Sequence, residues 1–112
     1  MYQENQEEAY NGGIIYVPVP RKKKYIGDKE ELSGGERTMA GIALLSAINI
    51  VRGVSFMVFD ESDAFLDAGN SYRFLRFIKN LSVNNDIQAI VITHKHRIYR
   101  NAESLVGATF TP

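Results

Sequence analysis

The chain has 112 residues, of which 45% are apolar, and its 13 basic side chains balance its 13 acidic ones, a length that suits one domain or one lobe. The neutral net charge argues against a protein that binds nucleic acid by overall charge attraction, and the absence of cysteine excludes disulfide bonds and cysteine-based zinc sites. No apolar run approaches the ~18 residues of a membrane span, and the acidic first residues do not resemble a targeting signal, so we expect a soluble intracellular protein.

The beginning of the chain combines an acidic end with a short strand. Residues 1–9 are polar and acidic without a clear period, so we expect a disordered end or the truncated stump of a longer chain. Residues 14–19 are mostly apolar and predict a strand. Pro18 and Pro20 place the far end of this strand at a sheet edge or outside the ladder.

A charged loop follows at residues 21–31 and begins with the basic cluster Arg21–Lys24. Four neighbouring cations could contact DNA through its phosphates. They could equally be a solvated loop, which is the more common outcome for a short charge run.

The remainder alternates between helical and strand-like patterns. The predicted elements are helices at 36–51, 70–81 and 97–103 and strands at 54–59, 87–92 and 105–110. The first helix leaves only a narrow polar stripe, so we expect it to be buried on most sides, with Gly53 as its stop signal. The first two strands are almost continuously apolar, which is typical of strands covered on both faces. The alternation predicts an α/β fold with a mainly parallel sheet flanked by helices.

The first candidate motif precedes the apolar helix. Ser33 and Glu36 have the spacing of a capping box. Gly34 and Gly35 would let an anion approach the backbone, where exposed amides and the helix dipole favour a phosphate. An ordinary helix start with a glycine-rich turn explains the same residues.

Two adjacent carboxylates end the first buried strand. Ligands of open α/β sheets gather at the carboxyl ends of strands. Asp60 could hold Mg²⁺ there, usually through water, and Glu61 could orient or deprotonate an attacking water. A buried strand that meets solvent through two acids is the plain alternative.

Two further residues extend this pattern. Asp67 follows the acids and is, by itself, more often a helix cap than a functional group. His94 follows the second buried strand, which places it on the same rim as Asp60 and Glu61. His96 has no such placement and is expected to be a surface residue.

The order and spacing of these motifs resemble the carboxy-terminal lobe of an ABC-type P-loop NTPase head. Leu32-Ser-Gly-Gly-Glu36 resembles the ABC signature motif, and Phe56–Glu61 resembles Walker B with its catalytic glutamate. Phe65-Leu-Asp67 resembles the D-loop, and His94 matches the switch histidine.

Within that superfamily the chain is similar to the SMC (structural maintenance of chromosomes) proteins from about residue 10 to residue 112. Asp60-Glu-Ser-Asp-Ala-Phe-Leu-Asp67 and the ending Ala102–Ala108 carry the resemblance, together with the signature region. The segment that begins at Tyr10 resembles the first SMC subunit of cohesin. His94 departs from eukaryotic SMC subunits, which often replace this histidine, and Phe65 stands where many members have a small residue.

The resemblance implies a set of roles. Asp60 would hold Mg²⁺, Glu61 and His94 would act on the attacking water and the γ-phosphate, and Asp67 would link two sites across a dimer. The signature residues Ser33, Gly34, Gly35 and Glu36 would bind the ATP held by an opposite head.

The resemblance also implies partners. The sequence contains no Gly-x-x-x-x-Gly-Lys-[Ser/Thr] and no heptad run. We therefore expect the chain to be part of an ATPase that cannot hydrolyse ATP without the amino-terminal P-loop lobe of the same SMC protein. The expected further partners are a second SMC head, a kleisin subunit and DNA, in a cohesin-like complex on nuclear chromosomes or on a prokaryotic nucleoid. The alternatives are the head of another SMC or DNA-repair ABC ATPase and an isolated kleisin-binding module.

Overall fold

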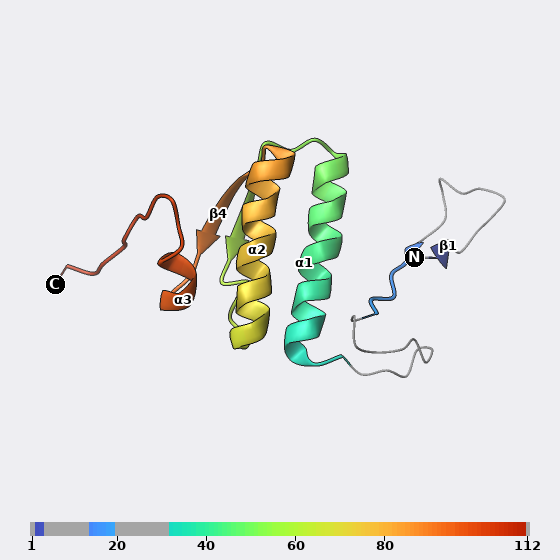
Figure 1. Cartoon of the computed structure of the whole chain (residues 1–112), viewed down its shortest axis with the longest axis horizontal. Helices are drawn as coiled ribbons and strands as arrows, with labels where there is room; N and C mark the ends of the chain where they lie inside the picture. The colour runs from blue at the N-terminus through green and yellow to red at the C-terminus, as the bar shows by residue number, and fades with distance from the viewer. Residues whose placement is uncertain (1, 4–13, 20–31, 112) are drawn as a thin grey trace. The chain divides into compact units, whose positions relative to one another are not determined.

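The computed structural model describes residues 2–3, 14–19 and 32–111. The chain divides into two units, residues 1–31 and 32–112, which are described separately. The predicted lobe of residues 10–112 extends across both units and stays a prediction. The basic cluster Arg21–Lys24 lies outside the described residues (Figure 1).

The first unit contains a short antiparallel strand pair. β1 (Tyr2–Gln3) pairs with β2 (Ile14–Ile15). Of the predicted disordered or truncated end at residues 1–9, the structure describes only β1, so that expectation stays a prediction. The predicted strand 14–19 is regular only at β2. Pro18 lies beyond the ladder, as expected for a residue without an N–H to donate, and Pro20 is outside the described residues.

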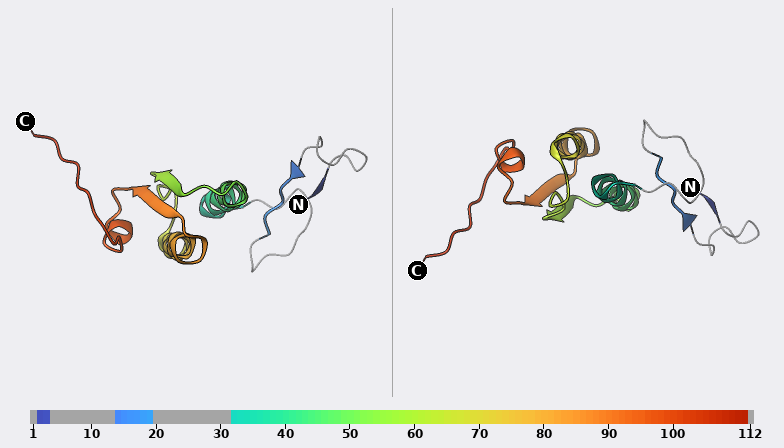
Figure 2. Two further views of the ribbon diagram at one scale, coloured as in Figure 1. Left: turned by 90° about the horizontal axis from the view of Figure 1, so that it is seen from above. Right: turned by 90° about the horizontal axis from the view of Figure 1, so that it is seen from below.

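The second unit is an α/β arrangement. Its elements follow in the order α1 (Gly34–Val51), β3 (Phe56–Asp60), α2 (Ala68–Asn85), β4 (Gln88–Ile92) and α3 (His96–Tyr99). β3 and β4 pair in parallel, and α2 is the crossover between them. This confirms the predicted parallel sheet flanked by helices. In Figures 1 and 2, α2 lies along the sheet, with α1 on one side and α3 on the other. None of the helices in the described part of the chain is long and apolar enough to cross a membrane.

Helix α1 begins and ends at the predicted signals. The Ser33 side chain accepts a hydrogen bond from the Glu36 amide (3.2 Å), and the Glu36 carboxylate accepts one from the Ser33 amide (3.0 Å), which completes a capping box. At the other end Gly53 has a φ of 69°, a left-handed conformation that favours glycine. The helix therefore starts two residues before its predicted beginning at residue 36 and stops at the predicted residue 51.

The core lies between α2 and one face of the sheet. Phe74 of α2 is fully buried and meets Phe59 of β3 edge to face, with ring centroids 5.6 Å apart. The buried core residues are Ile42, Met57, Phe59, Leu66, Phe74, Leu81, Ile87 and Ile98. Asp67 caps the start of α2, and Asp86 ends the helix in a left-handed conformation, so α2 is longer than the predicted 70–81.

The predicted burial of α1 on most sides is wrong for this chain. Only Ile42 and Ser46 of the helix are buried, whereas Leu45 is 59% and Val51 is 89% exposed. Only α2 packs against the helix within the described part of the chain. Met39 also packs against the core, whereas Leu45, Ile48 and Val51 stay exposed because no other described element covers that side of the helix.

The expectation that the strands are covered on both faces is also wrong. Met57 and Phe59 point to α2, while Phe56 and Val58 are more than half exposed on the opposite face. The register places the exposed residues of β4 on that same face, since Val58 lies opposite Ile90. We call the residues Phe56, Val58, Ile90 and Ile92 the open face. Helix α2 covers the other side of the sheet, and no described element packs on the open face.

The predicted last strand is absent. Residues 105–110 have no regular structure, and Phe110 is 95% exposed. A strand needs a neighbour for its backbone hydrogen bonds, and the sheet of the second unit has only β3 and β4 among the described residues. The predicted short helix 97–103 is present but shifted, as α3.

Candidate functional site

The two strands of the second unit end at the same edge of the sheet. Asp60, the last residue of β3, lies opposite Ile92, the last residue of β4. Because the strands are parallel, the segments that follow them both begin at this edge. The structure thus brings Asp60, Glu61 and His94 to one rim, as the sequence indicates.

Glu61 has an unusual backbone conformation. Its φ is 45°, which is uncommon for a residue other than glycine and persists only where the surroundings hold it. One such restraint is visible, because the Glu61 amide donates a hydrogen bond to the Ile92 carbonyl at 2.9 Å. The first residue after β3 is therefore fixed to the end of β4.

The side chains of Glu61 and His94 face each other. His94 Nδ1 and Glu61 Oε1 are 3.7 Å apart, and the side chains are 76% (His94) and 61% (Glu61) exposed. An exposed pair of this kind contributes at most about 1 kcal/mol to stability. Both groups therefore remain available to a ligand or a water at the rim.

Asp60 is exposed at the same rim. Across the residues with described positions, no group of three or more His, Asp or Glu side chains gathers that could hold a metal ion. Mg²⁺ commonly needs only one or two protein carboxylates, with waters and substrate phosphates completing its shell. Asp60 fits that mode of binding and does not fit a cage built of protein ligands alone.

The two glycines of the signature-like turn have different surroundings. A Cβ added to Gly34 would meet nothing within 4 Å, whereas one added to Gly35 would lie 2.7 Å from Nδ2 of Asn70. Gly35 thus packs closely on Asn70 at the start of α2, where any larger residue would force the Asn70 side chain to shift. Gly34 leaves the backbone open on its side, which is the property that binding of an anion needs.

Ser33 keeps a free donor in this turn. Its oxygen accepts the capping bond from Glu36, while a hydroxyl also carries one hydrogen to donate. Within the described part of the chain, neither Ser33 nor Gly34 is hydrogen-bonded to the rim formed by Asp60, Glu61 and His94. The chain therefore presents two separate groups of candidate residues.

Asp67 is a helix cap in this structure. Its Oδ1 accepts a hydrogen bond from the Asn70 amide at 2.7 Å, as its position before α2 favours. Asn70 is the residue that packs on Gly35, so the cap lies next to the contact between the two helices. A second role for Asp67 in binding across a dimer stays a prediction.

Three residues near the rim were missed as candidates. Lys95 donates hydrogen bonds to backbone carbonyls of the loop after β3, and Thr93 donates one to the buried carboxylate of Asp63. The available signal was the alternation at the end of β4, which puts residues 93 and 95 on one side of the backbone and 94 on the other.

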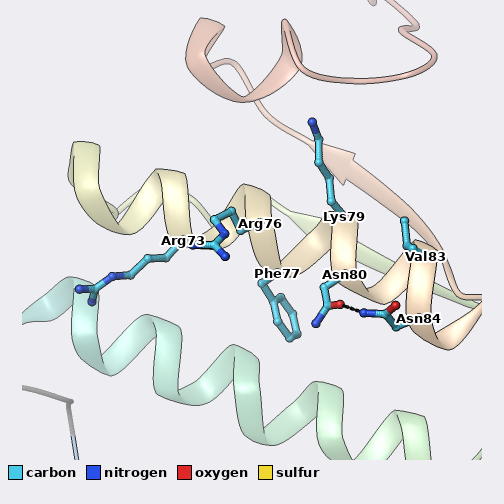
Figure 3. A pocket seen from close by; sticks show the side chains of 7 residues that line it. All are labelled: Arg73, Arg76, Phe77, Lys79, Asn80, Val83 and Asn84. Carbon is cyan, nitrogen blue, oxygen red and sulfur yellow. Dashed lines mark hydrogen bonds between the residues drawn. The ribbon is translucent and has the colours of Figure 1, made fainter.

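Helix α2 carries a shallow surface pocket. It has a volume of about 620 Å³ and is lined by Arg73, Arg76, Phe77, Lys79, Asn80, Val83 and Asn84, all of α2 (Figure 3). None of the predicted site residues contributes to it. The candidate residues at the strand ends are therefore separate from this pocket.

Comparison with known proteins identifies the family. A family model described as the RecF/RecN/SMC N terminal domain matches residues 22–112. The chain belongs to the SMC family. Because the description of this model names an N-terminal domain, the match does not support the predicted carboxy-terminal position of the lobe, which stays unconfirmed.

The relatives include SMC proteins of yeast and of Bacillus subtilis. The chain is 42% identical to Structural maintenance of chromosomes protein 1 of Saccharomyces cerevisiae over 104 residues, which is 93% of this chain and 8% of that protein. It is 41% identical to the Chromosome partition protein Smc of Bacillus subtilis over 102 residues, 91% of this chain and again 8% of that protein. The two identities are nearly equal, so these relatives support the SMC family without singling out cohesin.

A solved structure extends the similarity to the fold. It comes from a study of ATP-driven dimerization and DNA-stimulated activation of SMC ATPases, and it matches with a TM-score of 0.64 and 34% sequence identity. The match covers 71% of this chain and 48% of that chain. The second unit therefore has the fold of part of an SMC ATPase head.

Proposed function

We propose that this SMC chain supplies the signature-motif and Walker B side of a split ATPase site in an SMC head. The observation that carries the proposal is the placement of Glu61 and His94 beside Asp60 at the carboxyl edge of a parallel sheet, 3.7 Å apart and open to solvent. The P-loop comes from a second lobe, because the sequence contains no Walker A motif.

The rim residues divide the chemistry among them. Bound ATP supplies the phosphoryl group and Mg²⁺ supplies positive charge at its phosphates. Asp60 would hold the metal. Glu61 orients and polarises the attacking water, and His94, within reach of Glu61, donates a hydrogen bond to the γ-phosphate or to that water. Since phosphoryl transfer depends on positioning and charge, the fixed backbone of Glu61 supports this assignment.

The signature turn acts on a different nucleotide. Ser33 donates its free hydroxyl hydrogen, and the backbone of Gly34 and Gly35, which is open at Gly34, binds the γ-phosphate of ATP held by a partner SMC head. Glu36 keeps the turn in shape through the capping box. Asp67, next to the contact of α1 with α2, links the two sites across the dimer.

The open face supports the need for a second lobe. Monomeric proteins rarely leave large contiguous apolar patches uncovered. We assign the P-loop lobe as the partner that packs on Phe56, Val58 and Ile90 and on the exposed side of α1. A kleisin subunit is a further partner on family resemblance.

At the level of the cell, the chain acts in a chromosome-organising complex. In a cohesin-like complex, ATP would hold two heads together and hydrolysis would release them, which controls DNA entrapment or loop formation. Other SMC or DNA-repair ATPase complexes remain the alternative, with a nuclear or a nucleoid location according to the organism.

The decisive experiment compares steady-state ATP turnover of this chain alone with turnover after mixing with its matching P-loop lobe. We expect no turnover from the chain alone and turnover from the mixture. A mixture that is assembled and ATP-bound but silent would contradict the ATPase role. Binding of a kleisin carboxy-terminal segment without ATP would then favour an interaction module.

DNA contact is proposed for the basic cluster Arg21–Lys24 on its charge alone. Replacing all four residues with Ser should weaken DNA binding and make it less dependent on salt. The slope of log K against log salt should become shallower by ~0.9 for each DNA phosphate that the variant no longer neutralises. An unchanged slope in a salt titration by fluorescence anisotropy would show that this cluster is only a solvated loop.

A further inference from the structure

The ammonium group of Lys95 is surrounded by the loop that follows β3. Nζ donates hydrogen bonds to the carbonyls of Asp63 (2.5 Å), Leu66 (3.0 Å) and Ala64 (3.2 Å). An ammonium has three N–H donors, so its full donor capacity is used. The carbonyls of this loop converge on one side chain from the other strand end.

A second connection runs beside the first. Thr93 donates its hydroxyl hydrogen to Oδ2 of Asp63 at 2.6 Å, and the Lys95 amide donates to the Thr93 hydroxyl oxygen at 3.0 Å. Asp63 is only 2% exposed, and breaking this bond would leave a buried carboxylate short of a partner, which is costly. The loop after β3 and the segment after β4 are therefore joined twice at Asp63, by Lys95 at its backbone carbonyl and by Thr93 at its side chain.

His94 lies between the two anchored residues. Thr93 and Lys95 are partly buried against the loop, whereas the side chain of His94 is directed to solvent and faces Glu61. Glu61 in turn is fixed to β4 through the Ile92 carbonyl. Glu61 is thus held to the end of β4, and the residues on either side of His94 are held to the loop after β3.

We propose that Lys95 is a positioning residue that locks the loop of residues 63–66 to the end of β4. The lock holds His94 at its distance from Glu61 and sets the start of α2 at Asp67. Lys95 itself touches no substrate. The expected effect on ATP turnover rests on the proposed ATPase function, whereas the hydrogen bonds from Lys95 to the loop are a property of the chain itself.

The test replaces Lys95 with Met, which keeps the length of the side chain and removes the donors. In the head assembled with the P-loop lobe, kcat should fall about 10–100-fold, as expected for a small misplacement of reacting groups, while KM for ATP stays unchanged. Lys95→Arg should recover much of the rate because guanidinium also donates to carbonyls. Lys79→Met, on the exposed side of α2, is the matched control and should behave like the original.

A double-mutant cycle separates positioning from general stability. If Lys95 acts through His94, the effects of Lys95→Met and His94→Ala on kcat should be strongly non-additive. Additive effects, or a fall in kcat that follows only from a lower melting temperature, would overturn the proposal.

A second measurement does not depend on activity. Ala64 and Leu66 donate their amides to carbonyls within the loop, so hydrogen exchange at these two amides in the complete chain reports whether the loop is held. Lys95→Met should speed their exchange, and Lys79→Met should not. Equal exchange in both variants would disprove the lock. If the original assembled head has no turnover, the proposed function fails while this exchange experiment still decides the role of Lys95.

Discussion

Replacing Glu61 with Gln is expected to lower ATP turnover by ~10²–10⁴-fold, the usual contribution of a positioned general base, while ATP binding and engagement of the two heads persist. The amide keeps the size of the side chain and its place beside His94 but cannot accept a proton from water. Turnover is measured in the head assembled with the P-loop lobe, and engagement by ATP-dependent change in mass on size exclusion.

Glu103→Gln is the matched control for this change. Glu103 is exposed beyond α3 and lies in a segment without regular structure, so its neutralisation removes the same charge from the chain without touching the rim. We expect full turnover from the control. Equal turnover in Glu61→Gln and Glu103→Gln would remove Glu61 from the mechanism.

Truncating Phe74 to Ala is expected to lower the free energy of unfolding by about 3–5 kcal/mol, the range for large aromatic-to-alanine changes in cores. Phe74 is 0% exposed and packs edge to face on Phe59, so its loss leaves a cavity between α2 and the sheet. Since whole domains are stable by only ~5–15 kcal/mol, this loss is a large part of the total. Urea titration followed by circular dichroism measures it.

Phe110→Ala removes the same atoms from a side chain that is 95% exposed. We expect a change within about 0.5 kcal/mol, as for surface positions without special contacts. A similar loss in both variants would mean that the tail is packed in solution and that the core is not centred on Phe74.

Local signals in the sequence predict the elements of this chain well. The capping box of Ser33 and Glu36 and the stop at Gly53 predict the ends of α1 within two residues. The apolar runs that end in Asp60 and Ile92 predict two parallel strands whose ends share a rim. Each of these features depends on residues that lie close together in sequence, so the sequence alone is enough to predict them.

Burial is where prediction from the sequence failed. The apolar sides of α1 and β3 predict covered elements, and the structure leaves them open because no described element packs on them. The last predicted strand fails for the same reason, since residues 105–110 have no neighbour to pair with. Composition shows that a helix or strand has apolar side chains to bury, but it does not show whether another element covers them.

The contacts of Lys95 could not be predicted from the sequence. A lysine after a strand is ordinary, and its three acceptors are backbone carbonyls about 30 positions away, at separations of 32, 31 and 29 residues. Carbonyls are present in every residue, so no pattern of side chains marks them. Only the path of the loop after β3 brings them together.

If the P-loop lobe covers the open face as proposed, it would also slow the removal of this chain in the cell. Anything that binds only the folded form stabilises it by RT ln(1 + [L]/Kd), which is about 2.7 kcal/mol when the partner is at 100 times its Kd. With the open face uncovered, Phe56, Val58 and Ile90 would stay exposed to water and the chain would unfold more often, and unfolded chains are removed by proteases. A substitution that weakens docking of the P-loop lobe would therefore be expected to lower the cellular amount of this chain.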